Sequence, residues 1–283
     1  MHFTDSDIRR ITSAAGYFPV AAEGMRGYAA PSLAGDPGFS LVDVLRSADG
    51  PAARICKDRP KIRAVCSGGR FFKEYRIRGW WKLFRYRFRT PRPFRALKSA
   101  LRLREVGIAT PEVLLALRGT SCRGVRVDRL VTEALHEEVL FADRLLRERG
   151  AAVVDELVDE LTPLLAALHA AGIEHGDLNL RNLYRLPAAP ETKLRWGVID
   201  LDATRIGKAP VARVRRCRET ARLATSIRLA LPPEVRDRFP WEELLERCAR
   251  AYEKHADEML PRGTLRRAAR RLLAHHPMEE NAR

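Results

Sequence analysis

Polar residues in the second half of the chain occur at spacings that suit the transfer of a phosphoryl group. Asp177 lies in a short polar segment, Asn182 follows it by five residues, and Asp200 ends the apolar run 198–199. Phosphoryl transfer needs a carboxylate that accepts the proton of the attacking hydroxyl, and oxygen ligands for the magnesium ion that bridges the phosphates. We therefore predict that Asp177 is the catalytic base and that Asn182 and Asp200 bind Mg²⁺.

His175 opens the same polar segment, two residues before Asp177. One interpretation places His175 among the catalytic residues. The other is that His175 is a packed, hydrogen-bonded loop histidine that braces the segment around Asp177. The sequence leaves both interpretations open.

The elements that must position these residues can be read from the spacing of apolar side chains. Between Val154 and Leu168 apolar residues recur every three or four positions, which predicts a long helix that ends at Gly172 and contains Pro163. Two short strands are expected on either side of a loop, and three helices are expected after them. These elements are 183–186 and 196–200 for the strands, and 213–231, 241–260 and 264–275 for the helices.

The first half of the chain is richer in strand-like runs. Residues 1–49 contain scattered Gly and Pro, so we interpret them as a loosely structured lead-in with a short helix near 41–46. Strands are expected at 53–56, 62–66, 71–75, 113–117 and 125–133, with one helix at 94–106. Strands first and helices later predict an α+β chain, with a β-rich front lobe at 50–135 and a helical back lobe at 136–283.

Several motifs resemble known families. The pattern His-Gly-Asp-x4-Asn at 175–182, followed by Ile-Asp-Leu-Asp at 199–202, resembles the protein-kinase-like superfamily. The segments Phe-Phe-Lys-Glu-Tyr-Arg at 71–76 and Arg-Glu-Val-Gly-Ile-Ala-Thr-Pro at 104–111 are similar to the lipopolysaccharide kinase family. That family contains the kinases that phosphorylate heptose or Kdo in the lipopolysaccharide inner core, and related proteins whose substrates are not settled. The resemblance covers about residues 50 to 260.

This resemblance implies a two-lobed protein-kinase-like fold with a small β-rich N-lobe and a helical C-lobe. It also implies that the protein uses ATP and Mg²⁺. It implies that Lys73 contacts the α- and β-phosphates and that the backbone from Glu133 to Leu135 meets adenine. It also implies an ATP-dependent phosphotransferase that moves the γ-phosphate to a sugar hydroxyl of a lipid-linked glycan, with Asp177 as base.

Three positions depart from the kinase pattern. The segment 57–61, where a phosphate-covering loop is expected, contains no glycine. Ala96 stands where a helix glutamate is expected to orient Lys73, and Asn179 stands where many protein kinases have lysine. Two alternatives therefore remain: a kinase-fold enzyme acting on a small alcohol or a protein, and a non-catalytic kinase-like binding module.

Charge indicates which partners to expect. The formal net charge is +16, and basic residues alternate with Trp80, Trp81, Phe84 and Phe88 between Lys73 and Arg104. This composition suits a helix that rests on an anionic membrane surface, but the arginines could also be a solvated rim around packed aromatics. Binding of nucleic acid through arginines and stacking aromatics is the least favoured alternative.

The expected location follows from the cysteines and the N-terminus. The five cysteines include no CxxC pair, which favours a reducing compartment over a disulfide framework or a zinc site. Residues 1–10 lack the apolar stretch of a secretory signal. We therefore expect a cytoplasmic protein that can associate peripherally with the inner face of the cell membrane.

Overall fold

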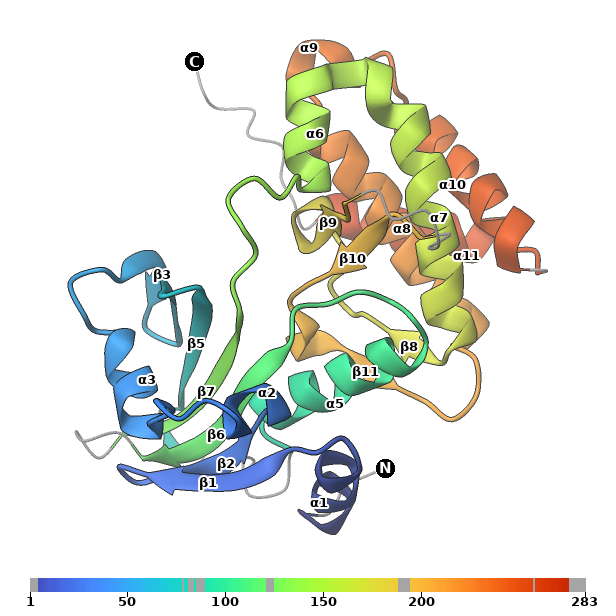
Figure 1. The fold of residues 1–283 in the computed structure, drawn as a ribbon. Coiled ribbons are helices and arrows are strands. Elements are labelled where there is room, and N and C mark those ends of the chain that lie inside the picture. Colours follow the sequence, from blue (N-terminus) through green and yellow to red (C-terminus); the bar gives the residue numbers. More distant parts are fainter. Residues whose placement is uncertain are drawn as a thin grey trace. The chain divides into compact units, whose positions relative to one another are not determined.

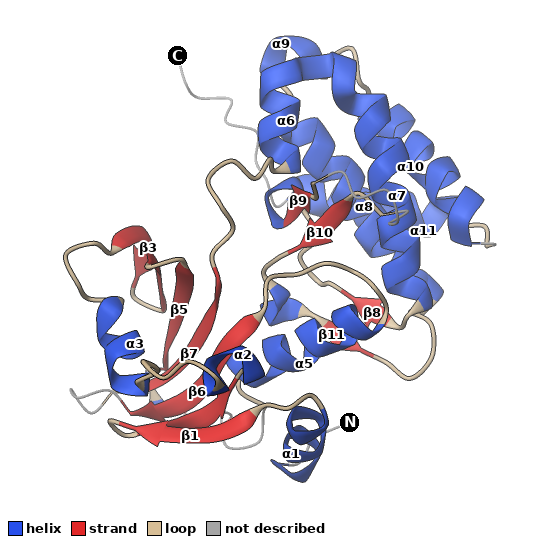
Figure 2. Ribbon diagram, in the orientation of Figure 1, coloured by secondary structure: helices blue, strands red, loops and turns tan. Residues whose placement is uncertain are grey.

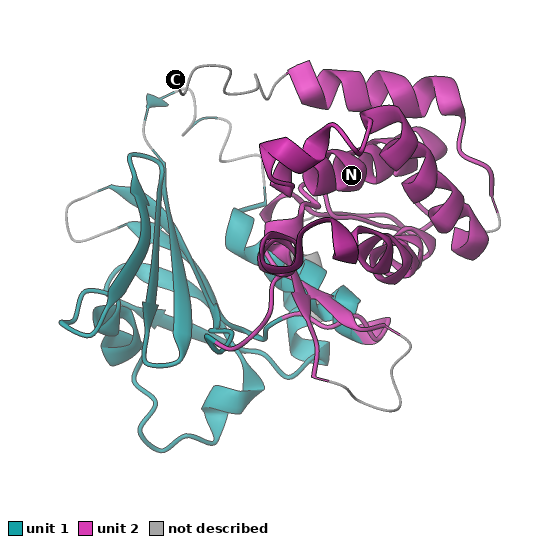
Figure 3. Ribbon diagram, turned by 90° about the horizontal axis from the view of Figure 1, so that it is seen from above, with its two compact units in different colours: residues 1–104, 111–137 teal, residues 105–110, 138–283 magenta. Residues whose placement is uncertain are grey.

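The computed structural model describes residues 5–77, 79–80, 84, 90–120, 125–187, 194–256 and 258–274 (Figure 1). The chain forms two compact units (Figure 3). The first comprises Met1–Arg104 and Pro111–Glu137, and the second comprises Glu105–Thr110 and Glu138–Arg283. The first is built around a sheet and the second is mostly helical (Figure 2), which confirms the predicted α+β class.

The first unit contains a seven-stranded antiparallel sheet in the order β1-β2-β6-β7-β5-β4-β3. The strands are β1 (Phe18–Ala22), β2 (Met25–Ala29), β3 (Arg54–Arg59), β4 (Ile62–Ser67), β5 (Arg70–Ile77), β6 (Val113–Thr120) and β7 (Arg126–Glu133). Gly68 and Gly69 both have positive φ, 54° and 71°, as a two-residue β4–β5 hairpin turn requires. All five strands expected from the sequence between 53 and 133 are therefore present.

Residues 1–49 differ from the loosely structured lead-in that we predicted. They form the helix α1 (Asp5–Ala14) and the β1–β2 hairpin, and β2 pairs with β6. The strands approach so closely that a Cβ on Gly27 would lie 1.9 Å from the carbonyl oxygen of Ala116. Gly27 therefore marks a close contact between strands, and Pro19 lies on the edge strand β1. Neither residue marks an irregular segment here.

Two further helices pack in the lead-in, α2 (Pro31–Ala34) and α3 (Leu41–Ser47). The second matches the short helix expected near 41–46. The side chain of Ser40 caps α3 by accepting a hydrogen bond from the Asp43 N–H at 3.3 Å.

Helix α5 (Arg92–Glu105) completes the first unit. The Phe94 ring packs edge-on against Tyr28 of β2, with centroids 6.1 Å apart, and the Arg92 guanidinium lies 5.2 Å from the Tyr75 ring centroid on β5. Gly107, which follows the helix, has φ +72°, consistent with the predicted helix end. Most of the basic, aromatic segment 80–89 lies outside the described residues. Of its aromatic residues, Trp80 and Phe84 are described, and both are exposed.

The second unit packs around α7 (Val154–Ala170), whose leucines at 157, 161, 164, 165 and 168 are all buried and which contains Pro163. Helices α8 (Arg213–Ala230) and α10 (Trp241–Ala256) pack against α7, and α11 (Arg262–Ala274) packs against α8. The remaining elements are α6 (Ala142–Arg149), α9 (Pro233–Arg236), the pair β8 (Ile173–Glu174) and β11 (Arg205–Ile206), and the pair β9 (Leu183–Arg185) and β10 (Trp196–Val198).

None of the helices within the described ranges combines the length and apolar character that a membrane-spanning segment requires.

Candidate active site

The predicted catalytic segment is the loop that joins β8 to β9 in the second unit. It starts at His175, directly after β8, and ends in a single 3₁₀ turn, η2 (Leu180–Asn182). Gly176 has φ +83°, and a Cβ there would lie 2.6 Å from the Ala203 carbonyl oxygen. Because of both constraints, this position accepts glycine and strains any larger residue.

Hydrogen bonds between asparagine side chains of this loop and its own backbone define its shape. The Asn182 Nδ2 donates to the Asp177 carbonyl at 2.8 Å, and the Asn179 Nδ2 donates to the same oxygen at 3.2 Å. The Asn179 Oδ1 also accepts from the Arg181 N–H at 3.1 Å, which caps η2. The two asparagines hold the backbone at Asp177, while its side chain is exposed.

His175 is buried, and both its ring nitrogens are used within the fold. Nε2 lies 2.9 Å from the Ile199 carbonyl oxygen, which can only accept, so Nε2 carries the proton. Nδ1 then accepts from the Asp177 N–H at 3.4 Å. These contacts favour the bracing interpretation of His175 over a catalytic one, because the ring is occupied in positioning the loop.

Asp200 is brought to the same loop by the strand before it. The Ile199 N–H donates to the Asn182 carbonyl at 2.9 Å, which ties the end of β10 to the end of η2. Asp200 itself has φ +60° and ψ +60°, a left-handed conformation that aspartate and asparagine tolerate better than most residues. The second unit thus gathers His175, Asp177, Asn182 and Asp200 around one loop and one strand end.

Glu219 on α8 anchors the loop, and the sequence analysis did not identify it. Its side chain is 1% exposed. Its Oε2 accepts the His175 N–H at 2.9 Å, and its Oε1 accepts the Gly176 N–H at 2.6 Å. A carboxylate among the inward-facing positions of an amphipathic helix is the signal that could have revealed it, because such a group is rarely buried without partners.

Glu219 also closes a buried chain of side chains that ends on α10. His169 of α7 lies 3.3 Å from its Oε2 through Nε2, and 2.9 Å from the Tyr252 hydroxyl through Nδ1. Burial raises the pKa of Tyr252 to about 12, so its hydroxyl keeps its proton and can donate to the His169 Nδ1. Helices α7, α8 and α10 are therefore joined by polar contacts next to the loop that carries Asp177.

The pKa of Glu219 is the balance of opposing effects. Burial alone would raise it, but the hydrogen bonds from the His169 ring and from the Gly176 N–H lower it below its ordinary 4.5. Glu219 is therefore ionised at neutral pH and accepts the two loop amides as a carboxylate, which strengthens both hydrogen bonds.

The remaining predicted residues lie in the first unit. Lys73 sits on β5 opposite Leu130, with its ammonium 5.5 Å from the Tyr75 ring centroid. At the end of β7 the Glu133 and Ala134 N–H groups donate to the carbonyls of Glu112 and Gly69, at 3.0 and 2.9 Å. The chain leaves the strand there and continues through Leu135.

No carboxylate of α5 takes the place of the expected helix glutamate. Ala96 is buried in the helix, and the only acidic residue of 92–105 is Glu105 in the last turn. The neighbouring Glu74 is bound by Arg129 and Arg76, at 2.9 and 3.0 Å. The departure noted from the sequence is therefore also present in the structure of this unit.

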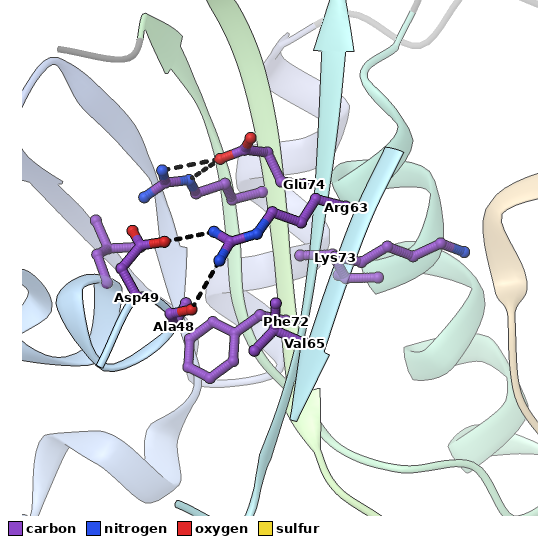
Figure 4. A pocket seen from close by; sticks show the side chains of 10 residues that line it. Ala48, Asp49, Arg63, Val65, Phe72, Lys73 and Glu74 are labelled. Atoms are coloured by element: carbon purple, nitrogen blue, oxygen red, sulfur yellow. Dashed lines mark hydrogen bonds and ion pairs between the residues drawn. The ribbon is translucent and has the colours of Figure 1, made fainter. Parts of the chain in front are cut away.

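A pocket in the first unit lies between α3 and the sheet (Figure 4). Figure 4 shows the Lys73 side chain pointing away from Phe72 and the Arg63–Asp49 ion pair. Lys73 is among the residues that line the pocket, and the other charged residues there are paired, Arg63 with Asp49 and Arg129 with Glu74. The charged end of Lys73 lies on the side away from these ion pairs.

The oxygen atoms of Asn182 and Asp200 in the second unit are ligands of the kind that suits magnesium. Because the Asn182 Nδ2 donates to Asp177, its Oδ1 is the acceptor that can face a cation, and Asp200 adds a carboxylate. Hard oxygen ligands of this kind, one or two per ion, suit Mg²⁺ when phosphate oxygens and water complete the shell. Among the described residues, no group of three or more His, Cys, Asp or Glu side chains could hold a metal ion.

The anchoring role of Glu219 predicts a pH-dependent loss of stability in Glu219→Gln. Glutamine offers one acceptor oxygen to two buried N–H groups, so at pH 7 we expect the melting temperature to fall by about 5 °C or more. A lowered pKa means that ionised Glu219 stabilises the fold above pH ~4.5 and that this contribution is lost as the pH falls through its folded pKa. The difference from wild type should therefore shrink in acid.

Thermal melts between pH 3.5 and 8 measure this effect, with Glu242→Gln in the exposed first turn of α10 as the matched control. Equal melting temperatures for wild type and Glu219→Gln at pH 7 would show that the two loop amides do not depend on this carboxylate.

The sequence model of the Lipopolysaccharide kinase (Kdo/WaaP) family matches residues 62–239. No curated protein matches the sequence.

Three solved structures share a similar chain path at low identity. WaaP in complex with acyl carrier protein is 20% identical, with 84% of this chain and 90% of that chain covered and a TM-score of 0.49. Glucosamine kinase in complex with glucosamine, ADP and inorganic phosphate is 14% identical, with 95% and 78% covered and a TM-score of 0.47. WbdD is 16% identical, with 78% and 49% covered and a TM-score of 0.43.

The family match spans more than half of the chain and includes β4 to β7, the catalytic loop, Asp200 and Glu219. The predicted kinase-like fold, with a β-rich and a helical part, is confirmed. This chain belongs to the lipopolysaccharide kinase (Kdo/WaaP) family.

Proposed function

We propose that this member of a kinase family transfers the γ-phosphate of ATP to a sugar hydroxyl of a lipid-linked glycan of the lipopolysaccharide-core type. Family membership supports a phosphotransferase that acts on a sugar. The observation that carries the finer proposal is the loop in which Asp177 is exposed while its backbone is held by His175, Asn179 and Asn182.

Asp177 is the general base in this proposal. Its carboxylate accepts the proton of the acceptor hydroxyl as the oxygen attacks phosphorus. His175 is a positioning residue, since its ring bonds the Asp177 N–H and the Ile199 carbonyl and is buried. Glu219 acts one step further back, through the amides of the loop.

Asn182 and Asp200 are the proposed ligands of Mg²⁺. Held by these residues, the ion would neutralise charge on the phosphate groups of the nucleotide. The hydrogen bond from Ile199 to Asn182 supports this assignment, because it holds the two ligand-bearing segments together.

Lys73 and the backbone that follows β7 are the proposed nucleotide contacts. Lys73 would pair with the α- and β-phosphates. The Glu133 and Ala134 amides are already bonded within the unit, so we assign the donor to adenine to Leu135. The Glu133 carbonyl accepts the Thr132 hydroxyl at 3.0 Å, and we assign its second lone pair as the acceptor for adenine.

Two other functions remain as alternatives. A kinase acting on a small alcohol or a protein would keep every role above and change only the acceptor. A non-catalytic binding module is favoured by the absence of a helix glutamate at Ala96 and of glycine in 57–61. The ordered catalytic loop favours the enzyme.

Replacement of the base tests the central assignment. Asp177→Ala should retain fold and nucleotide affinity but lose about 10²–10⁴-fold in kcat, the usual contribution of a positioned base. Steady-state kinetics with a glycolipid acceptor measures it, and Asp159→Asn, an exposed aspartate on α7, is the control. A folded Asp177→Ala enzyme that turns over within threefold of wild type would remove Asp177 from this role.

Metal-dependent nucleotide binding separates an active kinase from a binding module. ATP with Mg²⁺ should raise the melting temperature more than ATP alone, by the equivalent of about 2.7 kcal/mol when ATP is a hundred times its Kd. Asp200→Asn should abolish most of that difference, because asparagine tolerates the left-handed backbone but removes the charge. Asp202→Asn is the matched control; an equal loss in both variants, or no shift in wild type, contradicts the assignment.

We also propose that the protein works at an anionic membrane surface. Trp80 and Phe84 are 77% and 52% exposed, within a segment in which basic residues far outnumber acidic ones. Arg95, on the following helix α5, is exposed as well. Exposed aromatics among bases suit the headgroup region of a membrane.

Sedimentation with vesicles tests this location. Binding to phosphatidylglycerol-containing vesicles should exceed binding to pure phosphatidylcholine and fall at high salt, because charges are screened over ~8 Å at physiological ionic strength. Trp80→Ser should weaken it, whereas Met259→Ser, an exposed apolar residue of the other unit, should not. Equal, negligible binding to both vesicles would favour the solvated-rim alternative.

A further inference from the structure

Two cysteines meet on the β3–β4 hairpin of the first unit, outside the residues assigned to phosphoryl transfer. The Sγ atoms of Cys56 and Cys66 lie 3.4 Å apart. Regular pairing of the two strands shifts between Ile55 and Lys57, so Cys56 is the extra residue of a β-bulge. A bulge re-aims a side chain, and here it turns the Cys56 thiol toward Cys66.

We propose that Cys56 and Cys66 form a dithiol site that a peroxide oxidises reversibly to a disulfide across β3 and β4. A disulfide requires the sulfurs to approach to about 2.05 Å. All six residues of β3 are exposed, and β3 is the outermost strand of the sheet, so the small further approach disturbs little packing.

The two thiols have different roles because their surroundings differ. Cys56 is exposed and therefore meets the peroxide first. Cys66 is half-buried; burial and the contact with Cys56 raise its pKa to about 11, so it stays protonated at neutral pH and reacts second. Cys217 and Cys248 are buried in the second unit and are shielded from the reagent.

The chemistry balances with hydrogen peroxide as the oxidant. The Cys56 sulfur attacks one peroxide oxygen and the O–O bond breaks; the sulfur becomes a sulfenic acid, and the other oxygen leaves as water with the thiol proton. The Cys66 sulfur then attacks the Cys56 sulfur, the S–S bond forms, and the S–O bond breaks. The hydroxyl leaves as water with the Cys66 proton, so two thiols and one peroxide give one disulfide and two waters.

The dithiol site goes beyond the proposed function and does not depend on it. Its test measures the oxidation state of the cysteines and not kinase activity. Full-length reduced protein is treated with hydrogen peroxide, its remaining thiols are blocked, and it is digested with trypsin. We expect the peptides 55–57 and 64–70 joined, at two hydrogen masses below their sum, and separate again after dithiothreitol. Cys217 and Cys248 should be recovered as thiols in the same digest, which reports that the chain stayed folded.

Variants assign the order of the two steps. Cys66→Ser should leave Cys56 as a sulfenic acid that dimedone traps. Cys56→Ser, at an exposed position, should fold normally. In this variant peroxide should oxidise Cys66 at least about tenfold more slowly than in wild type. Cys122→Ser, which keeps the pair, should form the linked peptides like wild type. Recovery of both Cys56 and Cys66 as thiols from peroxide-treated wild type, or undiminished oxidation of Cys66 in Cys56→Ser, would overturn the proposal.

Discussion

The geometry of the loop that carries Asp177 depends on a buried carboxylate, that of Glu219. Glu219 accepts hydrogen bonds from the N–H groups of His175 and Gly176. It lies on α8, a helix that begins more than thirty residues after the loop ends. A buried charge is costly unless hydrogen bonds and opposite charges surround it, and here two amides and His169 do so. Removing those contacts would leave both the charge and the amides without partners, so the helix and the loop stabilise each other.

This arrangement explains how the Asp177 carboxylate, the proposed base, can be exposed while its backbone is held in place. Asp177 offers its side chain to solvent, while its backbone atoms are held by His175 and Asn182. The segments that hold it are in turn fastened to β10 through Ile199 and to α8 through Glu219. Positioning of this kind is what phosphoryl transfer demands of a protein, because the phosphates and metal supply most of the chemistry.

Two features of the first unit differ from what the sequence led us to expect. Its sheet is extended by the β1–β2 hairpin, which is packed so tightly against β6 that only glycine fits at position 27. Its helix α5 presents the buried Ala96 where a glutamate was expected. Gly27 has no side chain at a close strand contact, and Ala96 is a small side chain at a buried position, where a larger or charged group would need room and partners.

The sequence alone determined the features that depend on neighbouring residues. Apolar spacing predicted α7 and the strands between 53 and 133, and the five-residue step from Asp177 to Asn182 predicted one loop. Contacts between distant segments were decided only by the tertiary structure: the hairpin at 18–29 pairs with β6, Glu219 bonds the loop, and the bulge at Cys56 brings two sulfurs together. Periodicity reports which face of an element is buried, whereas the partner that buries it depends on how the whole chain folds back on itself.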